Sequence, residues 1–406
     1  MGILERWLGE AGGKKDLHLL LFIGGLYSLS IALSNTFVNV YLWKQSGQIV
    51  DIAVYNLTVV LFQPLTFVFA GRLAKKVDRI IVLRLGVIFL ALFYLSVLLV
   101  GTRATDFLWL LGGLLGIGYG FYWLAYNVLT FEITEPETRD FFNGFLGILS
   151  SIGGMVGPIL SGFIISRLEK FTGYSIVFGL SLLLFSIAVF LSFSLKRRPA
   201  HGRYCFFRIL QERKNNRNWL LITRAHFFQG IREGTFMFII SITVFIQTDS
   251  ELALGSYGLL NSAISFVAYF FASRYIKQPM RKKAILIGGI LLYAGVLLIA
   301  FDITFGKLLI YGAIVATAYP ILLVPYISLT YDIIGRAWKA AEMRIEYIVV
   351  RELFVHIGRI VSISGFILSV MLFDLKQLLP IYLLIVGAGH TVIYWFVRKI
   401  DIIDQD

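Results

Sequence analysis

The sequence predicts an all-α integral membrane protein of about twelve transmembrane helices, arranged as two six-helix bundles related by pseudo-two-fold symmetry. Three observations lead to this fold class: apolar stretches of spanning length, an internal repeat, and a composition of 58% hydrophobic and only 15% charged residues. A soluble domain of 406 residues could not bury so much apolar surface, whereas a bilayer accommodates it.

Each apolar stretch is long enough to cross a bilayer, because about 20 helical residues span a hydrocarbon core of about 30 Å. Polar or charged residues mark where each stretch begins and ends. The predicted spans are residues 17–42, 51–71, 80–100, 106–131, 141–166, 174–195, 219–246, 254–276, 284–301, 307–331, 349–372 and 378–397.

The second half of the chain repeats the first at a nearly constant offset. Tyr55 recurs as Tyr257 and Gly86 as Gly288, in both cases 202 residues later. Further matches join Ala70 to Ala272, Arg72 to Arg274, residues 129–133 to 329–333 and residues 161–163 to 364–366. With six spans in each half, the two halves run parallel and are related by an axis along the membrane normal.

A basic segment separates the two repeats. We therefore expect an N-terminal six-helix bundle over residues 1–195, a basic linker over 196–217 and a C-terminal six-helix bundle over 218–406. Lys and Arg are concentrated in alternate loops, which by the positive-inside rule places both termini and the linker in the cytoplasm. This topology, and not a nucleic-acid partner, accounts for the net charge of +13. Cys205, the only cysteine, lies in the linker, so that no intrachain disulfide is possible.

The loop after the second predicted span begins at Gly71 and contains Asp78 and Arg79. In this it resembles the major facilitator superfamily, whose members are secondary transporters, although Lys75 occupies the family's usual acid position. Glu132 and Arg139 stand seven residues apart across a later loop, similar to an element of the sugar porters. The resemblance implies that these residues form a cytoplasmic gate. Solvated loop charges are the alternative.

The fifth span resembles the Gly-Pro element of the family's antiporters through Gly153, Gly157, Pro158 and Gly162. Glycines let helices approach closely, and a proline removes a backbone hydrogen bond, so this span is suited to tight packing and a bend. The resemblance implies alternating access by rocking of the two bundles.

Ionisable residues at membrane depth gather in the second half. The seventh span carries Arg232 and Glu233, and the eleventh carries Glu352, His356 and Arg359 along one helix face. Charge at this depth costs about 2.5–3.5 kcal/mol per residue, so it is expected to face a cavity or a partner. These residues either bind an anionic substrate and the coupling proton, or form salt bridges that only hold two helices together. In the resembled fold the two helices are neighbours, which pairs Glu233 with Arg359.

Polar residues of the first half offer further candidates for a substrate cavity. They are Asn35, Asn39, Gln63 and Tyr126. Each could equally form a hydrogen bond to a neighbouring helix or pack within it.

The sequence thus predicts a multi-pass plasma-membrane protein that acts as a monomeric secondary active transporter by alternating access, with proton-coupled export of an anionic or amphiphilic small molecule. An uncoupled facilitator or a lipid flippase of the same fold is the alternative. A membrane-embedded enzyme is disfavoured, because there is no nucleophile elbow and the loops are short. No phosphate-binding Gly-Lys-Ser/Thr loop and no metal-ligand spacing is present, so we expect no cofactor, no metal and no nucleic-acid partner.

Overall fold

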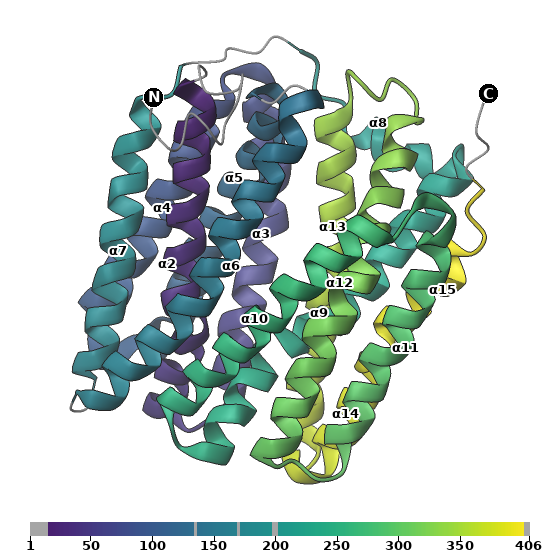
Figure 1. Ribbon diagram of the computed structural model, residues 1–406. Helices are drawn as coiled ribbons and strands as arrows, with labels where there is room; N and C mark the ends of the chain where they lie inside the picture. Colours follow the sequence, from purple (N-terminus) through teal and green to yellow (C-terminus); the bar gives the residue numbers. More distant parts are fainter. Residues whose placement is uncertain (1–14, 134–135, 169–170, 197–201, 402–406) are drawn as a thin grey trace.

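The computed structural model describes residues 15–133, 136–168, 171–196 and 202–401, apart from the side chains of residues 131–133, 136–145 and Lys376. Figure 1 shows long helices lying side by side, with α2 beginning and α15 ending toward the same end of the bundle. Every regular element in these ranges is helical. The predicted all-α class is therefore confirmed.

In the first half, six long helices cross the molecule in alternating directions. They are α2 (Lys15–Ser46), α3 (Ile49–Lys76), α4 (Arg79–Val100), α5 (Leu108–Ile133), α6 (Pro136–Arg167) and α7 (Thr172–Phe193), with a 3-10 helix η2 (Gly101–Phe107) between α4 and α5. Asp78 begins α4, because its carboxylate accepts a hydrogen bond from the Ile80 backbone N–H at 2.7 Å.

The second half follows a short connecting segment that is itself partly helical. Its elements are α8 (Phe206–Gln211), η3 (Glu212–Lys214), α9 (Arg217–Thr248), α10 (Glu251–Tyr275), η4 (Gln278–Met280), α11 (Arg281–Ala300), α12 (Phe305–Gly335), α13 (Arg344–Leu372), α14 (Leu375–Gly387) and α15 (Gly389–Val397). Side chains of Asn216, Ser250 and Thr304 cap the first turns of α9, α10 and α12.

The long helices agree with the twelve predicted crossings. Eleven candidate spans are found among the described residues, and one of them, Arg79–Thr130, is 52 residues long because it contains α4, η2 and most of α5. That span crosses twice, since about 20 residues suffice for one crossing. Observed helix ends extend a few residues beyond most predicted ends, as polar termini continue the backbone hydrogen bonding.

The last span differs from the single helix over 378–397 that the sequence predicts. It is divided at Ala388 into α14 and α15. Gly387 and Gly389 flank the break, where a Cβ on Gly389 would lie 2.5 Å from the Phe228 carbonyl oxygen of α9. The glycines weaken the helix and permit this close approach. As a result, His390 lies directly against α9.

The helices before and after the connecting segment meet along two seams, α6 with α10 and α3 with α13. Glycines of α6 allow close packing on both of its neighbours, α2 and α10. A Cβ on Gly157 would lie 2.7 Å from the Ala32 carbonyl carbon of α2, and one on Gly162 would lie 2.5 Å from the Glu251 carbonyl oxygen of α10. Pro158 packs against Gly255 and Gly258 of α10. Residues 153–162 thus hold α6 between α2 and α10.

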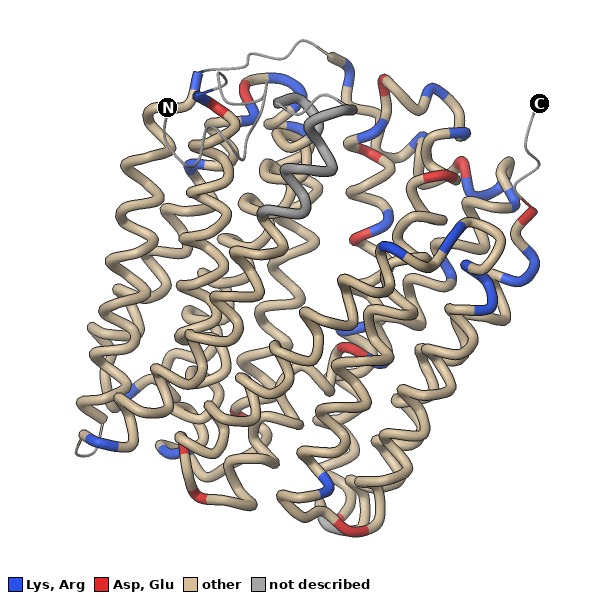
Figure 2. The backbone as a smooth tube through the Cα atoms, in the orientation of Figure 1, with Lys and Arg blue, Asp and Glu red and all other residues tan. Residues whose placement is uncertain are grey.

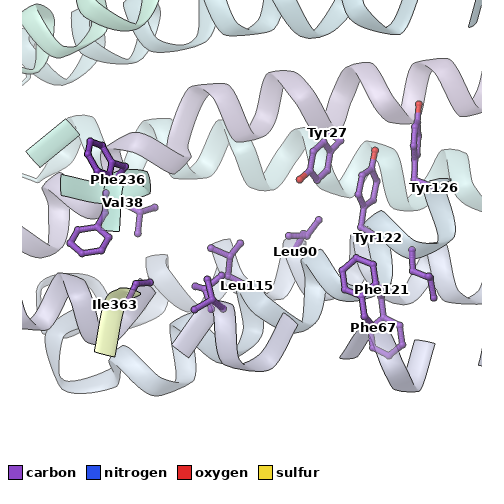
Figure 3. Close-up of a cluster of buried hydrophobic side chains, with 14 of the residues drawn as sticks. Tyr27, Val38, Phe67, Leu90, Leu115, Phe121, Tyr122, Tyr126, Phe236 and Ile363 are labelled. Carbon is purple, nitrogen blue, oxygen red and sulfur yellow. The ribbon is translucent and has the colours of Figure 1, made fainter. Parts of the chain in front are cut away.

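Basic residues are concentrated at one end of the bundle, shown in blue at the top of Figure 2. We call this the basic end and define it by residues 72–79, 202–217 and 336–344. The interior of the first half is instead neutral and aromatic. Figure 3 shows Tyr27, Tyr122 and Tyr126 next to one another, and the Tyr27 and Tyr122 rings stack at 3.9 Å between centroids.

Candidate functional site

The charged residues predicted at membrane depth come together between α9 and α13. Oε2 of Glu233 accepts hydrogen bonds from Arg359 Nη2 at 2.6 Å and from Arg359 Nε at 3.2 Å. The expected pairing of Glu233 with Arg359 is therefore present. Two hydrogen bonds to one carboxylate hold the planar guanidinium in a defined orientation, which a lysine could not reproduce.

Glycines bring the backbones of α9 and α13 into contact at this pair. A Cβ on Gly230 would collide with the carbonyl oxygen of Val355, and one on Gly358 would collide with that of Phe227. On the next turn, a Cβ on Gly234 would lie 2.7 Å from the Arg359 carbonyl oxygen. The close approach lets short-range hydrogen bonds form across the two helices and leaves little room for water between them.

The second carboxylate oxygen of Glu233 faces three other groups. Oε1 accepts hydrogen bonds from Gln229 Nε2 at 2.8 Å and from the Tyr319 hydroxyl of α12 at 3.0 Å. His390 Nε2 lies 4.0 Å from the same oxygen. Glu233 thus accepts hydrogen bonds from α9, α12 and α13, and His390 of α15 lies near it without a hydrogen bond. These hydrogen bonds stabilise its ionised form.

His390 is fully buried, and neither of its ring nitrogens has a hydrogen-bond partner among the described residues. A buried polar group without a partner is costly, so such a group needs an explanation. The ring lies between Tyr319, with centroids 5.7 Å apart, and the carboxylate of Glu233. Protonation of Nε2 would allow a charged hydrogen bond to Glu233 after a shift of about 1 Å.

Arg232 lies next to Glu233 on α9 but points to different neighbours. Its Nη2 donates to the Tyr311 hydroxyl of α12 at 3.0 Å, and its guanidinium carbon lies 4.2 Å from the centroid of the Phe236 ring. Its buried Nε has no hydrogen-bond partner in the described part of the chain. One permanently charged donor therefore remains available next to the pair.

Glu352 and His356 continue the polar face of α13 toward the basic end. Glu352 pairs with the adjacent Arg351. His356 Nδ1 lies 2.8 Å from the Glu352 carbonyl oxygen, and its Nε2 lies 3.4 Å from Arg359 Nη1. A carbonyl only accepts and a guanidinium only donates, so His356 is neutral with its proton on Nδ1. Its ring lies 6.2 Å from that of Phe67 on α3, at the seam between the halves.

The polar candidates of the first half are engaged with neighbouring helices. Asn39 accepts a hydrogen bond from Asn56 at 2.8 Å, and Asn35 accepts one from Tyr119 at 3.3 Å. Tyr126 donates to the Leu20 carbonyl at 3.2 Å. Gln63 is buried on α3.

At the basic end, the halves are joined by an ion pair between residues outside the predicted gate. Lys75 Nζ donates to Glu346 Oε1 at 2.5 Å and to the Glu342 carbonyl at 2.9 Å, and both side chains are buried. The Cys205 backbone N–H also donates to Glu346 Oε1, at 3.1 Å. Lys75 of α3, the connecting segment and Glu346 of α13 therefore form one buried contact.

The predicted gate residues surround this contact in part. A Cβ on Gly71 would lie 2.8 Å from the Tyr204 hydroxyl oxygen, so Gly71 lets the connecting segment pack onto α3. Burial, and after it the Glu346 carboxylate, raise the pKa of Tyr204. Asp78 caps α4, and Arg79 lines a cavity of about 760 Å³ next to Lys75. The side chains of Glu132 and Arg139 lie outside the described residues.

At the opposite end, a second ion pair joins the halves. Lys44 of α2 donates to Glu251 of α10 at 2.6 Å, and the Tyr174 hydroxyl of α7 donates to the same oxygen at 2.8 Å. An ion pair therefore joins the two halves at each end of the molecule.

Among the residues that sequence reasoning missed are His390, Lys75, Glu346 and Glu251. His390 could have been found as an ionisable residue within the twelfth span. Lys75 stands at the position of the family's usual acid, and Glu346 supplies the opposite charge from the first turn of α13. Nothing in the sequence marked Glu251 as an interhelical partner, because an acidic residue in the first turn of a helix is common.

Comparison with known proteins identifies the family to which the chain belongs. The model of the Major Facilitator Superfamily matches residues 20–362. YqgE of Bacillus subtilis (strain 168), described as an uncharacterized protein, is 61% identical over 400 residues, which cover 98% of this chain and 93% of the relative. An uncharacterized protein in the sodM 3'region of Geobacillus stearothermophilus is 63% identical over 178 residues, 44% of this chain and 83% of that protein. The chain belongs to the Major Facilitator Superfamily and is a multi-pass membrane transporter of small molecules.

Proposed function

We propose that this protein is a proton-coupled secondary transporter that works by alternating access between two six-helix bundles, residues 1–195 and 218–406. The observation that carries the proposal is the Glu233–Arg359 pair with His390 next to it, whose ring nitrogens have no hydrogen-bond partner in the described part of the chain. A carboxylate, a guanidinium and a neutral imidazole at membrane depth provide a proton acceptor, an anion-binding group and a second proton site. A purely structural pair would not need the unpartnered histidine.

Coupling follows from competition for Glu233. While Glu233 holds Arg359, the guanidinium is not free to bind an anion. Protonation of Glu233, or neutralisation of its charge by a protonated His390 at Oε1, weakens its hold on Arg359 at Oε2. An anion that binds Arg359 therefore favours proton uptake, and the two move together. A positively charged amphiphile that binds Glu233 instead displaces the proton and moves against it.

We propose export for cargo of the second kind, because an inward proton gradient drives export only when proton and cargo exclude one another. Anionic cargo would use the same residues with the opposite sign of coupling. The test is transport by the purified chain in liposomes against a panel of anionic and amphiphilic compounds, with the pH gradient imposed in each direction. Equal rates with and without the gradient for every transported compound would refute proton coupling.

An uncoupled facilitator or a lipid flippase of the same fold is the second candidate. The neutral, aromatic interior of the first half favours it, because Tyr27, Tyr122 and Trp123 form a cluster suited to lipophilic cargo. This candidate predicts transport that does not depend on Glu233 and is unaffected by the gradient.

We further propose that the basic end faces the cytoplasm of the cell, with the gate formed around Gly71, Asp78 and Arg79 together with Glu132 and Arg139. The concentration of Lys and Arg at this end supports the orientation. In intact cells, an impermeant maleimide should leave Cys205 unlabelled, whereas inside-out vesicles should allow labelling. Labelling of Cys205 from the outside of intact cells would contradict this orientation.

A further inference from the structure

A groove of about 900 Å³ runs between α10, α11 and α12, three of the membrane-spanning helices. Its walls are apolar on all three helices, with Val267 and Phe271 from α10, Ile287 from α11 and Ile321 from α12. Among the described residues that line it, Lys283 is the only charged one. The groove lies outside the charged site, because none of Arg232, Glu233 and Arg359 lines it.

The groove arises from a difference between the two repeats. In the first half, Gly112, Gly116 and Gly120 of α5 let α3 pack directly on that helix: a Cβ on Gly112 would lie 2.7 Å from the Tyr55 carbonyl oxygen, and one on Gly116 would lie 2.5 Å from that of Val59. Such close contact along a glycine face leaves no space for another molecule.

In the second half, only the first of these glycines is retained. At an offset of 200 residues, Gly112 corresponds to Gly312, but Gly116 and Gly120 correspond to Ala316 and Pro320. Gly312 still packs on Tyr257 of α10, with 2.7 Å between a Cβ there and the Tyr257 ring. Overall, α12 is in less extensive contact with α10 than α5 is with α3, and Thr317 and Ile321 line the groove.

The less extensive contact leaves α10 the least buried of the candidate spans. Val267 and Phe271 are 51% and 52% exposed, although both line the groove within a membrane-spanning helix. Exposed apolar surface at this depth is covered either by protein or by lipid acyl chains, and no described residue covers it.

Lys283 differs from the two basic residues that precede it at the start of α11. Arg281 pairs with Asp332 at 2.5 Å, and Lys282 donates to the Ile400 carbonyl at 2.6 Å. Lys283 is exposed and has no partner among the described residues, and it lies at the end of the groove nearest the basic end. A cation at the mouth of an apolar groove complements an anionic head joined to an acyl chain.

The length of the groove fits one leaflet of a bilayer. Its lining on α10 runs from Ala263 to Tyr275, twelve residue steps, or about 18 Å at about 1.5 Å per residue. Half of a hydrocarbon core of about 30 Å is about 15 Å. We infer that the groove binds an anionic phospholipid from the leaflet at the basic end, with an acyl chain between α10 and α11–α12 and the phosphate on Lys283.

The experiment measures lipids retained by the purified full-length chain, by native mass spectrometry, and the midpoint of thermal unfolding. Three probes are compared: phosphatidylglycerol, phosphatidylcholine with the same acyl chains, and glycerol phosphate, which has the charge without the chains. We expect phosphatidylglycerol to be retained preferentially and to raise the unfolding midpoint, while glycerol phosphate has no effect. Equal retention of both lipids, or an equal effect of glycerol phosphate, would overturn the inference.

Two variants separate the chain from the head. Ala268→Trp fills the groove and should abolish retention of both lipids, and Ile287→Trp makes the same test from the opposite wall if the first variant does not fold. Lys283→Ala should retain lipid but lower the preference for phosphatidylglycerol about fivefold, as expected for one lysine near an anionic head.

Matched controls lie outside the groove. Lys399 is exposed just after α15, and Leu99 is exposed on α4. Lys399→Ala and Leu99→Trp should bind both lipids as the unmodified chain does. Unchanged selectivity in Lys283→Ala, or unchanged retention in the filled variants, would show that lipid binds elsewhere.

Discussion

The two halves of this chain place different chemistry on a repeated scaffold. In the first half, Ser30 of α2 forms hydrogen bonds with the backbone of α7, and Tyr27 stacks on Tyr122. At the 202-residue offset, Ser30 corresponds to Arg232 of α9, and the next position carries Glu233. Neutral contacts hold helices together at any pH. The partly buried carboxylate and guanidinium also depend on where protons are, so the packing of α9 on α13 is sensitive to protonation of Glu233.

The contrast also appears in how the helices meet. The glycine face of α5 packs on α3 without any charged group, whereas Gly230, Gly234 and Gly358 bring α9 and α13 together around the Glu233–Arg359 pair. In the first half, close packing joins α3 and α5 through neutral contacts alone. In the second half it partly shields an ion pair from water, which strengthens the attraction and makes the loss of one partner costly.

The largest effect is expected from breaking this pair. Glu233→Gln or Arg359→Gln alone leaves an unpaired charge and should lower the free energy of unfolding by about 3–5 kcal/mol. The double variant should regain stability but lose proton-driven transport, because neither a proton acceptor nor an anion-binding group remains. Thermal stability and transport in liposomes measure the two properties separately.

The control is the pair between Lys307 and Asp302 at the opposite end, where both side chains are more exposed. Its removal should change stability by at most about 1 kcal/mol. Full transport activity in the double variant at Glu233 and Arg359 would assign the pair a structural role and remove the proposed contrast between the halves.

A somewhat smaller effect is expected from loosening the contact between α6 and α2 in the first half. Gly157→Leu places a side chain against the Ala32 backbone and should destabilise the packing of α6 by about 1–3 kcal/mol. The span stays apolar, so membrane insertion should be normal while transport is lost. Gly147→Leu is the matched control on the same helix, because nothing lies within 4 Å of a Cβ there. Equal transport by the two variants would show that close packing of α6 is not needed.

The ion pair at the basic end tests how the halves are joined. Glu346→Gln removes the charge that Lys75 and the Cys205 backbone share, and it should raise the rate of Cys205 labelling in inside-out vesicles about tenfold, equivalent to about 1.4 kcal/mol. Glu342→Gln is the control, since that side chain is exposed and lies 3.6 Å from Lys339. A labelling rate that stays constant in Glu346→Gln would mean that this contact does not hold the halves together.

The smallest effect is expected from the aromatic interior of the first half. A double-mutant cycle with Tyr27→Leu and Tyr122→Leu should give a coupling free energy of about 0.5–1.5 kcal/mol. Proton dependence of transport should not change in either variant, because neither ring carries charge. A change in that dependence would extend the coupling machinery into the first half.

Much of the fold could be predicted from the sequence because a bilayer imposes simple rules. Apolar length gives the spans, and loop charge gives the expected orientation. Even the proximity of Glu233 and Arg359 could be expected, because the resembled fold makes their helices neighbours and opposite charges at membrane depth lower one another's energy. The same reasoning did not include His390, because a single histidine in an apolar span carries no periodic signal.

Other features depend on contacts between residues far apart in the chain. The sequence alone determined the number of crossings, the repeat and the concentration of charge in the second half, because these follow from local composition and from the cost of charge in lipid. Only the tertiary structure decided that Lys75 pairs with Glu346 across 271 positions, that the last span breaks at Ala388 so that His390 meets Glu233, and that α12 contacts α10 less extensively than α5 contacts α3. Each of these depends on how closely two backbones approach, and that distance is set by the side chains of both helices together.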